Sequence, residues 1–310
     1  MKTRTAFIFP GQGSQFVGMG KDIAGAYPEA HRVFEEAGEA LGFDLERLCF
    51  EGPEKELGLT INTQPAILAV SVALWRVVQK AGIQPDFVAG HSLGEYSALV
   101  AAEAFSFTDA IKLVRARAHY MQDAVQEGKG AMAAVLGLSE EKITDLFESL
   151  HIQKQVFIAN LNCPGQIVIS GKKEAVELFM NKAQDMGVRC ILLGVSVPSH
   201  CPLMDTAGTL LEEQLHGVQI DQPKIPVVTN VDAKIITERD DVLPALVRQI
   251  SSILRWEESM LLLMKKGVEV FVEIGPGRVL SNLLRRINRQ VKTLNAQDQA
   301  GLQQVLTLLS

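Results

Sequence analysis

The sequence predicts an α/β protein built on a mostly parallel sheet. Along the 310-residue chain, short apolar runs typical of buried strands alternate with longer segments of helical spacing. One of these runs ends in a Gly-x-Ser-x-Gly turn at residues 90–94. A central block has the different order βαββαβ, which is the ferredoxin-like pattern. We therefore expect a large α/β domain of residues 1–129 and 198–310, with an inserted ferredoxin-like subdomain of residues 130–197.

The first half of the large domain begins with an apolar strand. The expected elements are, in order, a strand at 5–9, a helix at 27–41, a helix at 64–78, a strand at 85–89 and a helix at 96–104. Pro65 takes a first-turn position of its helix, where the missing N–H costs nothing. The run 85–89 is short and apolar, as a buried parallel strand is, whereas 96–104 is rich in Ala and Leu. Thr108 can cap the next helix, which carries Arg117.

The inserted block and the second half of the large domain show similar patterns. In the block we expect strands at 131–136, 156–160, 167–170 and 190–195, helices at 139–150 and 173–186, and a turn at Pro164-Gly165. Beyond it we expect a helix at 204–215, a strand at 225–230, a helix at 243–263 broken near Arg255-Trp256, and a strand at 268–274. A basic helix that contains Arg285 and Arg286 follows Gly275-Pro276-Gly277.

Composition limits the classes of function. The formal net charge of −6, with both signs mixed along the chain, argues against general nucleic-acid binding, which needs a clustered basic excess. No apolar run reaches the ~20 residues of a membrane span, and residues 1–9 lack a signal-peptide pattern. The four Cys show no Cys-x-x-Cys spacing and the six His no His-x-x-x-His pair, so we expect no metal site. A cytoplasmic monomer without a membrane or nucleic-acid partner is expected.

The turn at 90–94 carries the clearest chemical signal. Gly90 and Gly94 lack a Cβ, so a strand and a helix can crowd around Ser92. The turn lifts the Ser92 hydroxyl clear of the sheet and sets it at a helix N-terminus, where the dipole and free N–H groups favour developing negative charge. Ser92 is therefore the candidate nucleophile of an acyl-transfer site, and we expect the large domain to be hydrolase-like.

A serine nucleophile needs a base, and His200 is the best candidate. It lies where the inserted block returns to the large domain, and clefts form at such junctions. Cys201 is a rival nucleophile, but the side chains of adjacent residues usually diverge. No acid near Ser92 has a signature position, so a backbone or amide oxygen could orient the imidazole instead.

Two further segments have alternative interpretations. The loop at 11–15 fails the Gly-x-Gly-x-x-Gly dinucleotide pattern, because Phe16 stands at the third glycine position. It is either a structural turn or a close backbone approach at the end of a strand, where the Gln12 N–H would serve an oxyanion hole. Arg117 is either solvated surface or the bidentate partner of a substrate carboxylate, a task that Arg suits better than Lys.

Five motifs stand in a characteristic order along the chain. They are Pro10-Gly11-Gln12-Gly13-Ser14-Gln15, Thr63-Gln64-Pro65-Ala66, Gly90-His91-Ser92-Leu93-Gly94-Glu95, Val197-Pro198-Ser199-His200 and Glu273-Ile274-Gly275-Pro276-Gly277. Together they resemble the malonyl-CoA:acyl carrier protein transacylases of bacterial fatty acid synthesis, with matching order and spacing over essentially the whole chain. The resemblance implies ping-pong transfer of malonyl from malonyl-CoA to the phosphopantetheine thiol of holo acyl carrier protein, without a metal or an organic cofactor.

The resemblance also implies roles for individual residues. Ser92 would be the nucleophile and His200 its base. The backbone N–H groups of Gln12 and Leu93 would form the oxyanion hole. Arg117, which ends an Arg-x-Arg stretch, would hold the malonyl carboxylate.

The resemblance gives Gln249 the task of orienting His200 through its backbone carbonyl, which accounts for the absent triad acid. A serine esterase or thioesterase on the same turn is the alternative, as is a non-catalytic carrier-protein binder. A patatin-type hydrolase needs an Asp-Gly turn, and the chain has no Asp-Gly dipeptide. An α/β-hydrolase should show an acid at a strand end between Ser92 and His200, and none stands out. An intact set of reactive residues argues against a pure binder.

An acidic carrier protein is expected to dock beside the cleft on a local basic patch. The helix after Gly277 brings Arg285, Arg286 and Arg289 close together, with Lys292 just beyond. Arg285 and Arg289 are expected one helical turn apart, on a shared face. The alternative is an ordinary solvated helix end, where Arg is favourable in any case.

Overall fold

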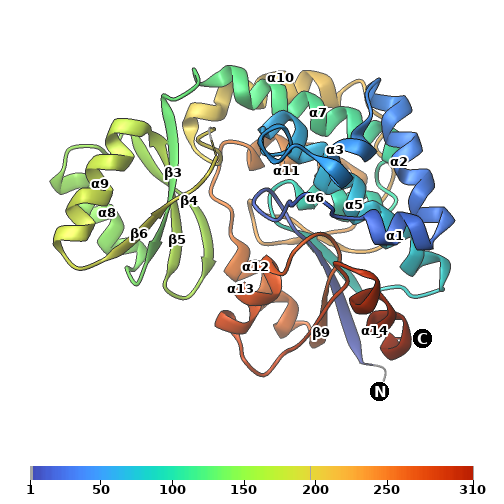
Figure 1. Ribbon diagram of the computed structural model, residues 1–310. Coiled ribbons are helices and arrows are strands. Elements are labelled where there is room, and N and C mark those ends of the chain that lie inside the picture. Colours follow the sequence, from blue (N-terminus) through green and yellow to red (C-terminus); the bar gives the residue numbers. More distant parts are fainter. Residues whose placement is uncertain (1–2, 196, 310) are drawn as a thin grey trace.

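Two sheets organise the chain in the computed structural model, which describes residues 3–195 and 197–309 (Figure 1). The large sheet has six strands in the order β10-β9-β1-β2-β7-β8. They are β1 (Arg4–Phe9), β2 (Phe87–Gly90), β7 (Val227–Val228), β8 (Ile235–Ile236), β9 (Val268–Glu273) and β10 (Lys292–Asn295). Neighbouring strands are parallel except β7 and β8. The carboxyl ends of β1, β2 and β9 therefore meet at one edge, where three of the five motifs lie.

Helices cover both faces of the large sheet. Side chains alternate along each strand, so that on β1 Phe7 and Phe9 face one layer while Ala6 and Ile8 face the other. The first layer contains α1 (Lys21–Ala26), α2 (Pro28–Leu41), α3 (Leu45–Glu51), α4 (Glu54–Leu57), α5 (Thr60–Lys80), α6 (Gly94–Ala101), α7 (Phe107–Ala124), α10 (Asp205–Leu215), α11 (Val242–Gln249) and α14 (Gln299–Leu309). The second layer contains α12 (Trp256–Lys265) and α13 (Val279–Ile287). Such double cover is what a mostly parallel sheet requires.

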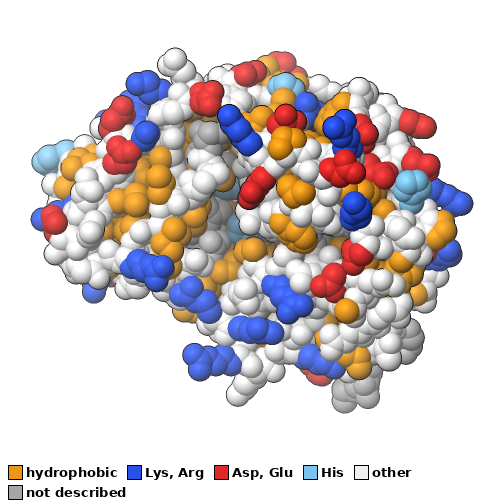
Figure 2. Space-filling model, viewed as in Figure 1, with side chains coloured by type: hydrophobic (Ala, Val, Ile, Leu, Met, Phe, Trp, Pro, Cys, Tyr) orange, Lys and Arg blue, Asp and Glu red, His pale blue; other side chains and the backbone are white. Residues whose placement is uncertain are grey.

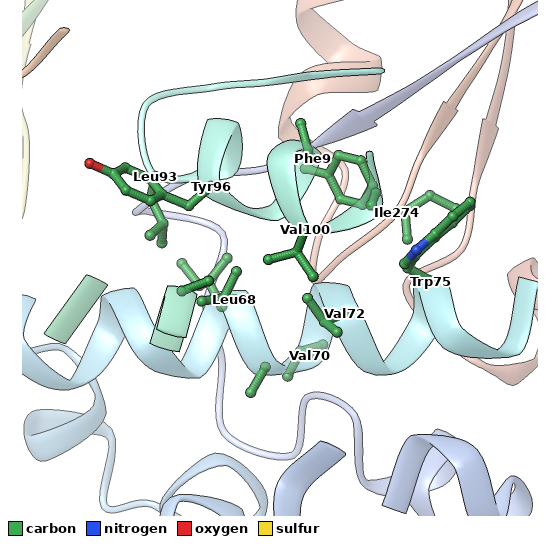
Figure 3. Close-up of a cluster of buried hydrophobic side chains, with 14 of the residues drawn as sticks. Phe9, Leu68, Val70, Val72, Trp75, Leu93, Tyr96, Val100 and Ile274 are labelled. Atoms are coloured by element: carbon green, nitrogen blue, oxygen red, sulfur yellow. The ribbon is translucent and has the colours of Figure 1, made fainter. Parts of the chain in front are cut away.

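Helix α5 lies at the centre of the first layer. Figure 3 shows Leu68, Val72 and Trp75 of this helix directed towards Val100 of α6 and towards β1. The ring of Trp75 meets the ring of Phe7 edge-on, with 5.9 Å between centroids. By length and composition α5 is the one helix among the described residues that could cross a membrane, but it is mostly buried inside the protein, as core helices are.

Helix α5 begins earlier than the sequence predicts. Its first residue is Thr60 rather than Gln64 or Pro65, so Pro65 lies inside the helix. A proline there cannot donate to the carbonyl of Ile61, one turn before it. The guanidinium of Arg115 on α7 donates to this carbonyl instead, with Nη1 2.7 Å from the oxygen. A tertiary hydrogen bond thus replaces the missing helical one.

The second sheet is antiparallel, with four strands in the order β4-β5-β3-β6. Its elements follow one another as β3 (Gly130–Leu136), α8 (Glu140–Ser149), β4 (Val156–Cys163), β5 (Gln166–Lys172), α9 (Lys173–Asp185) and β6 (Arg189–Leu192). One face packs on α8 and α9 around Ile143 and Phe179. The other face carries an apolar cluster that includes Met132, Ala134 and Val168, and these side chains face the large domain.

The structure corrects several expected boundaries. The break expected near Arg255-Trp256 in the helix at 243–263 is present, but it spans residues 250–255, where Leu254 forms backbone hydrogen bonds with β4. The cap of α7 is Ser106, whose hydroxyl accepts from the backbone N–H of Asp109. Thr108 lies inside the helix and donates to Glu36. The strand expected at 225–230 is reduced to β7.

The short or peripheral elements were not predictable from local sequence patterns. These are α1, α3, α4, β8, β10, α14 and the 3-10 helices at Pro202–Met204 and Arg239–Asp241. Most have too few residues for a periodic apolar pattern to stand out. Their packing against the rest of the chain, rather than local propensity, stabilises them.

The carboxylate of Glu273 holds the start of α13. It accepts from the backbone N–H groups of Leu280 and Ser281 at 3.0 and 2.9 Å, from the Ser281 hydroxyl at 2.6 Å and from the Asn295 amide at 3.3 Å. The first N–H groups of a helix have no partner within it, and the helix dipole favours an anion there. Leu280 and Leu283 of α13 line the cleft described below, so Glu273 positions one wall of that cleft.

Glu273→Ala should lower the free energy of unfolding by roughly 2–4 kcal/mol, because it leaves several buried donors without an acceptor. Glu273→Gln should lower it less, since the amide keeps one acceptor oxygen. Urea denaturation followed by circular dichroism measures both. Equal losses in the two variants, or no loss in Glu273→Ala, would contradict the capping role.

Candidate active site

A cleft of about 420 Å³ separates the apolar face of the small sheet from the large sheet and its helices. Figure 2 shows a hollow between the two lobes, with hydrophobic side chains around it. Loops that follow β1 and β2 line the cleft on the large-domain side, together with α13. Strands β3, β4 and β5 line the opposite side. Sites in α/β proteins lie at the carboxyl ends of strands and between lobes, so this is the candidate active site.

Ser92 stands on the expected sharp turn between β2 and α6. Its backbone φ is 54°, in the left-handed region that residues other than glycine rarely adopt. A Cβ on Gly90 would lie 1.9 Å from the carbonyl carbon of Gly94, and a Cβ on Gly94 would lie 2.0 Å from the carbonyl oxygen of Phe9. Close backbone approach therefore requires both glycines, which confirms the sequence prediction.

The side chain of Asn230 holds this turn from the loop after β7. Its Oδ1 accepts from the backbone N–H of Ser92 at 2.7 Å, and its Nδ2 donates to the carbonyl of Gly90 at 2.6 Å. The backbone N–H of Asn230 donates in turn to the buried carboxylate of Glu95 at 3.1 Å. Neither Asn230 nor Glu95 is among the site residues predicted from the sequence. The available signals were that Asn230 ends an expected strand and that Glu95 ends the motif around Ser92.

The imidazole of His200 bonds to Ser92 on one side and to Gln249 on the other. Its Nε2 lies 2.8 Å from Ser92 Oγ, and its Nδ1 lies 2.8 Å from the backbone carbonyl oxygen of Gln249. A carbonyl only accepts, so Nδ1 carries the proton and Nε2 accepts from the Ser92 hydroxyl. Burial, followed by the charge of Arg117, lowers the pKa of His200 to about 3. The imidazole is therefore neutral at neutral pH, as a general base must be.

Arg117 reaches from α7 to the same hydroxyl and is buried. Its Nη2 lies 3.3 Å from Ser92 Oγ and 3.1 Å from Gln249 Oε1, and its Nη1 lies 2.7 Å from Gln64 Oε1. The guanidinium carbon lies 5.6 Å from the centre of the Tyr96 ring. These partners are neutral, and burial lowers the pKa of Arg117. A buried cation held by neutral groups beside a nucleophile can attract an anionic substrate group.

Gln249, the last residue of α11, connects these groups. Besides its backbone contact with His200, its side-chain Oε1 accepts from Arg117. Its Nε2 donates to the carbonyl of Ser92 and to Glu95 Oε2, both at 2.9 Å. The resemblance implied only the backbone contact, and the side-chain bonds are an addition from the structure.

Gln12 and Leu93 line the same cleft. Leu93 directly precedes α6, and Gln12 lies in the loop after β1. Within the described part of the chain, no hydrogen bond is formed by either backbone N–H. Both groups are therefore free to donate to an oxyanion that forms near Ser92.

The remaining candidates lie outside this constellation. Cys201 is buried, and its thiol faces the carbonyl of Pro198 at 3.1 Å rather than the cleft. Arg285 and Arg286 are exposed in the last turn of α13. Arg289 lies beyond the end of this helix, so the expected one-turn relation between Arg285 and Arg289 is wrong. Over the described ranges, no group of three or more His, Cys, Asp or Glu side chains could hold a metal ion.

The imidazole of His200 should stay neutral from about pH 8 to about pH 5, because its folded pKa lies far below 6.5. Unfolding restores the higher pKa and takes up a proton, so the folded protein should lose stability as the pH falls below 6.5. Proton NMR, with the resonance assigned through a His200→Ala variant, measures the titration. A midpoint near 6.5 would contradict the buried, neutral state.

Comparisons with known proteins agree with this geometry. The family model of the acyl transferase domain matches residues 6–306. The malonyl CoA-acyl carrier protein transacylase of Bacillus subtilis strain 168 is 48% identical over 298 residues, covering 96% of this chain and 94% of the relative. The protein of the same name from Escherichia coli strain K12 is 48% identical over 296 residues, covering 95% of each chain.

Solved structures give the same result. A malonyl-transacylase in complex with its type II PKS acyl-carrier protein has a TM-score of 0.95 at 46% identity, covering 98% of this chain and 99% of the other. An acyl-carrier-protein S-malonyltransferase from Bartonella henselae has a TM-score of 0.95 at 41% identity, covering 99% of both chains. The chain therefore belongs to the acyl transferase family and, within it, to the malonyl CoA-acyl carrier protein transacylases.

Proposed function

We propose that this acyltransferase moves the malonyl group from malonyl-CoA to the phosphopantetheine thiol of holo acyl carrier protein through a malonyl ester on Ser92, and so supplies fatty acid synthesis. One observation carries the proposal. The Ser92 hydroxyl lies 2.8 Å from the neutral His200 Nε2 and 3.3 Å from the guanidinium of Arg117. A base and a cation for an acid-bearing acyl group thus meet at one nucleophile.

The first half-reaction loads the enzyme. Ser92 Oγ attacks the thioester carbonyl of malonyl-CoA while its proton passes to His200 Nε2. The free N–H groups of Gln12 and Leu93 stabilise the oxyanion of the tetrahedral intermediate. The carbon–sulfur bond then breaks, His200 returns the proton to the sulfur, and CoA leaves as a thiol. The backbone carbonyl of Gln249 stabilises the transient imidazolium by accepting from Nδ1.

The second half-reaction reverses these roles. The phosphopantetheine thiol gives its proton to His200, and the sulfur attacks the malonyl ester. When the new thioester forms, the proton passes to Ser92 Oγ and the free enzyme returns. The relatives are acyl carrier protein transacylases, and one is solved in complex with its acyl-carrier protein, which supports a carrier-protein acceptor over the water of an esterase.

The lobe organisation belongs to the same proposal. We treat residues 130–197 as a ferredoxin-like subdomain inserted in a hydrolase-like domain of residues 1–129 and 198–310. Separate hydrophobic cores support this division, one around α5 and one between the small sheet, α8 and α9. The cytoplasmic location and the monomeric state stay predictions.

Exposed Arg285 and Arg286 are our candidates for docking the carrier protein. The helix α13 that carries them also supplies Leu280 and Leu283 to the cleft, so a carrier bound there would be close to the cleft. Figure 2 shows several Lys and Arg side chains below the hollow, on the part of the surface where α13 lies in Figure 1. A solved relative is a malonyl-transacylase in complex with its acyl-carrier protein, which supports a carrier protein as the partner that docks.

Ser92→Ala should abolish the covalent adduct and the transfer, because the Ser92 hydroxyl is the group that hydrogen-bonds to His200 Nε2. Intact-mass spectrometry after mixing with malonyl-CoA measures the adduct, and peptide mapping finds its position. A malonyl adduct that survives on another residue, such as Cys201, would refute the assignment.

Arg117→Ala should slow malonyl loading by ~10–100-fold, because a charge-assisted bidentate pair in a buried site is lost. Acetyl loading should be spared or increased, since acetyl has no carboxylate. Competition between malonyl-CoA and acetyl-CoA, read by intact mass, measures the ratio. Equal loss for both acyl groups would indicate a structural role for Arg117.

Arg285→Glu with Arg286→Glu should slow transfer to carrier protein at low salt, because surface charges mainly set the encounter rate. Loading from malonyl-CoA and transfer to free pantetheine should change little. The double variant Arg32→Glu with Arg47→Glu, which makes the same charge change on α2 and α3, is the control. If the Arg285→Glu with Arg286→Glu variant transfers malonyl to carrier protein at the parental rate at low ionic strength, the docking site lies elsewhere.

A further inference from the structure

We propose that Glu95 is a positioning residue for acyl-group selectivity: it sets the orientation of the Gln249 amide, and that amide holds Arg117 beside Ser92. The proposal rests on the function proposed above and adds a selectivity determinant that does not touch the substrate. It is carried by the hydrogen bonds beneath the nucleophile.

The orientation of the Gln249 amide follows from its donors. Nε2 has two hydrogens, and it donates to two acceptors, Glu95 Oε2 and the carbonyl of Ser92, each at 2.9 Å. Oε1 is thereby turned to Arg117 Nη2 at 3.1 Å. A flipped amide would bring Oε1 against two acceptors and Nε2 against a guanidinium that only donates. Glu95 is one of the two groups that exclude the flipped state.

The orientation matters because Arg117 is fully buried. Its Nη1 and Nη2 each bond one glutamine oxygen, from Gln64 at 2.7 Å and from Gln249 at 3.1 Å. A buried guanidinium hydrogen that loses its acceptor is costly, so Arg117 would shift to find another. Any such shift moves Nη2 away from Ser92 Oγ and therefore from the acyl group that the serine carries.

Positioning needs an acceptor at Glu95 Oε2 and does not need a charge. Burial raises the pKa of Glu95 to about 7, against the opposing effect of its hydrogen bonds with Gln249 and Asn230. Both bonds fall on Oε2, and within the described residues Oε1 makes none. A proton on Oε1 therefore leaves both bonds in place. A glutamine at position 95, with its oxygen in the place of Oε2, should do the same.

The test compares loading rates for malonyl-CoA and acetyl-CoA by intact-mass spectrometry. The proteins are the parent, Glu95→Ala, Glu95→Gln and Glu213→Ala, an exposed acidic position on α10 as the control. Glu95→Ala should lower the ratio of malonyl to acetyl loading by about tenfold or more, because it frees the amide that holds Arg117. Glu95→Gln and Glu213→Ala should stay within about threefold of the parental ratio.

A double-mutant cycle tests whether Glu95 acts on Arg117 through the Gln249 amide. In a Gln249→Ala background the backbone carbonyl remains but the amide is gone, so adding Glu95→Ala should change the ratio by at most about twofold. Thermal melts and fluorophosphonate labelling of Ser92 report folding and the serine–histidine pair separately from selectivity.

Each outcome decides the proposal. Equal loss of malonyl and acetyl loading in Glu95→Ala, or a tenfold change of the ratio that persists in the Gln249→Ala background, overturns it. A similar fall in the ratio of malonyl to acetyl loading in Glu95→Gln also overturns the proposal, because that variant keeps an acceptor oxygen for the Gln249 amide. If the unaltered protein forms no malonyl ester, the proposed function itself fails, and this case is recognised from the parent alone.

Discussion

The left-handed backbone at Ser92 is the constraint on which the rest of the site depends. A non-glycine residue in that conformation is strained and persists only where its surroundings hold it. Two glycines make room for the turn, and the Asn230 side chain bonds the backbone on both sides of His91. The same turn fixes where the hydroxyl points, where α6 starts and which N–H groups remain free. His200, with φ at 60°, adopts the same unusual region, and its backbone N–H donates to the carbonyl of Ile250.

Burial disfavours the charged form of both ionisable groups beside Ser92, His200 and Arg117, but the two end in different charge states. It favours the uncharged form of each, so the pKa of His200 falls to about 3 and that of Arg117 is lowered from a much higher ordinary value. His200 becomes neutral and can accept a proton, whereas the ordinary pKa of a guanidinium is so high that Arg117 stays charged. A base and a cation thus coexist beside one hydroxyl. The charge of Arg117 in turn helps keep His200 neutral.

The small sheet contributes surface rather than catalytic groups. One of its faces packs on α8 and α9, and the other presents an apolar cluster to the cleft. Backbone hydrogen bonds between β4 and Leu254 tie the sheet to the segment that follows Gln249. The segment that orients His200 is therefore also a segment that holds the two lobes together. This connection explains why the chain leaves the helical conformation at residues 250–255, next to the break expected near Arg255-Trp256.

The sequence by itself predicted β1, β2, β7 and β9 of the large sheet, the turn at Ser92 and the position of His200 just after the inserted block. These features are local: an apolar run, two glycines four residues apart and a histidine at a junction can each be recognised within a few residues. The motif resemblance chose between the alternatives for Arg117 and Gln12 and added Leu93 and Gln249. Contacts between residues far apart in the sequence could not be predicted in this way.

Tertiary structure alone decided the polar network beneath Ser92. Asn230 bonds a residue 138 positions away, and Gln249 bonds Glu95 across 154 positions. Pro65 is tolerated inside α5 because Arg115 supplies the donor that proline lacks. In the sequence Asn230, Glu95 and Arg115 are ordinary polar residues in ordinary elements. The role of each residue depends on which buried donors or acceptors the fold leaves without a partner. Those groups are known only when the elements are packed together.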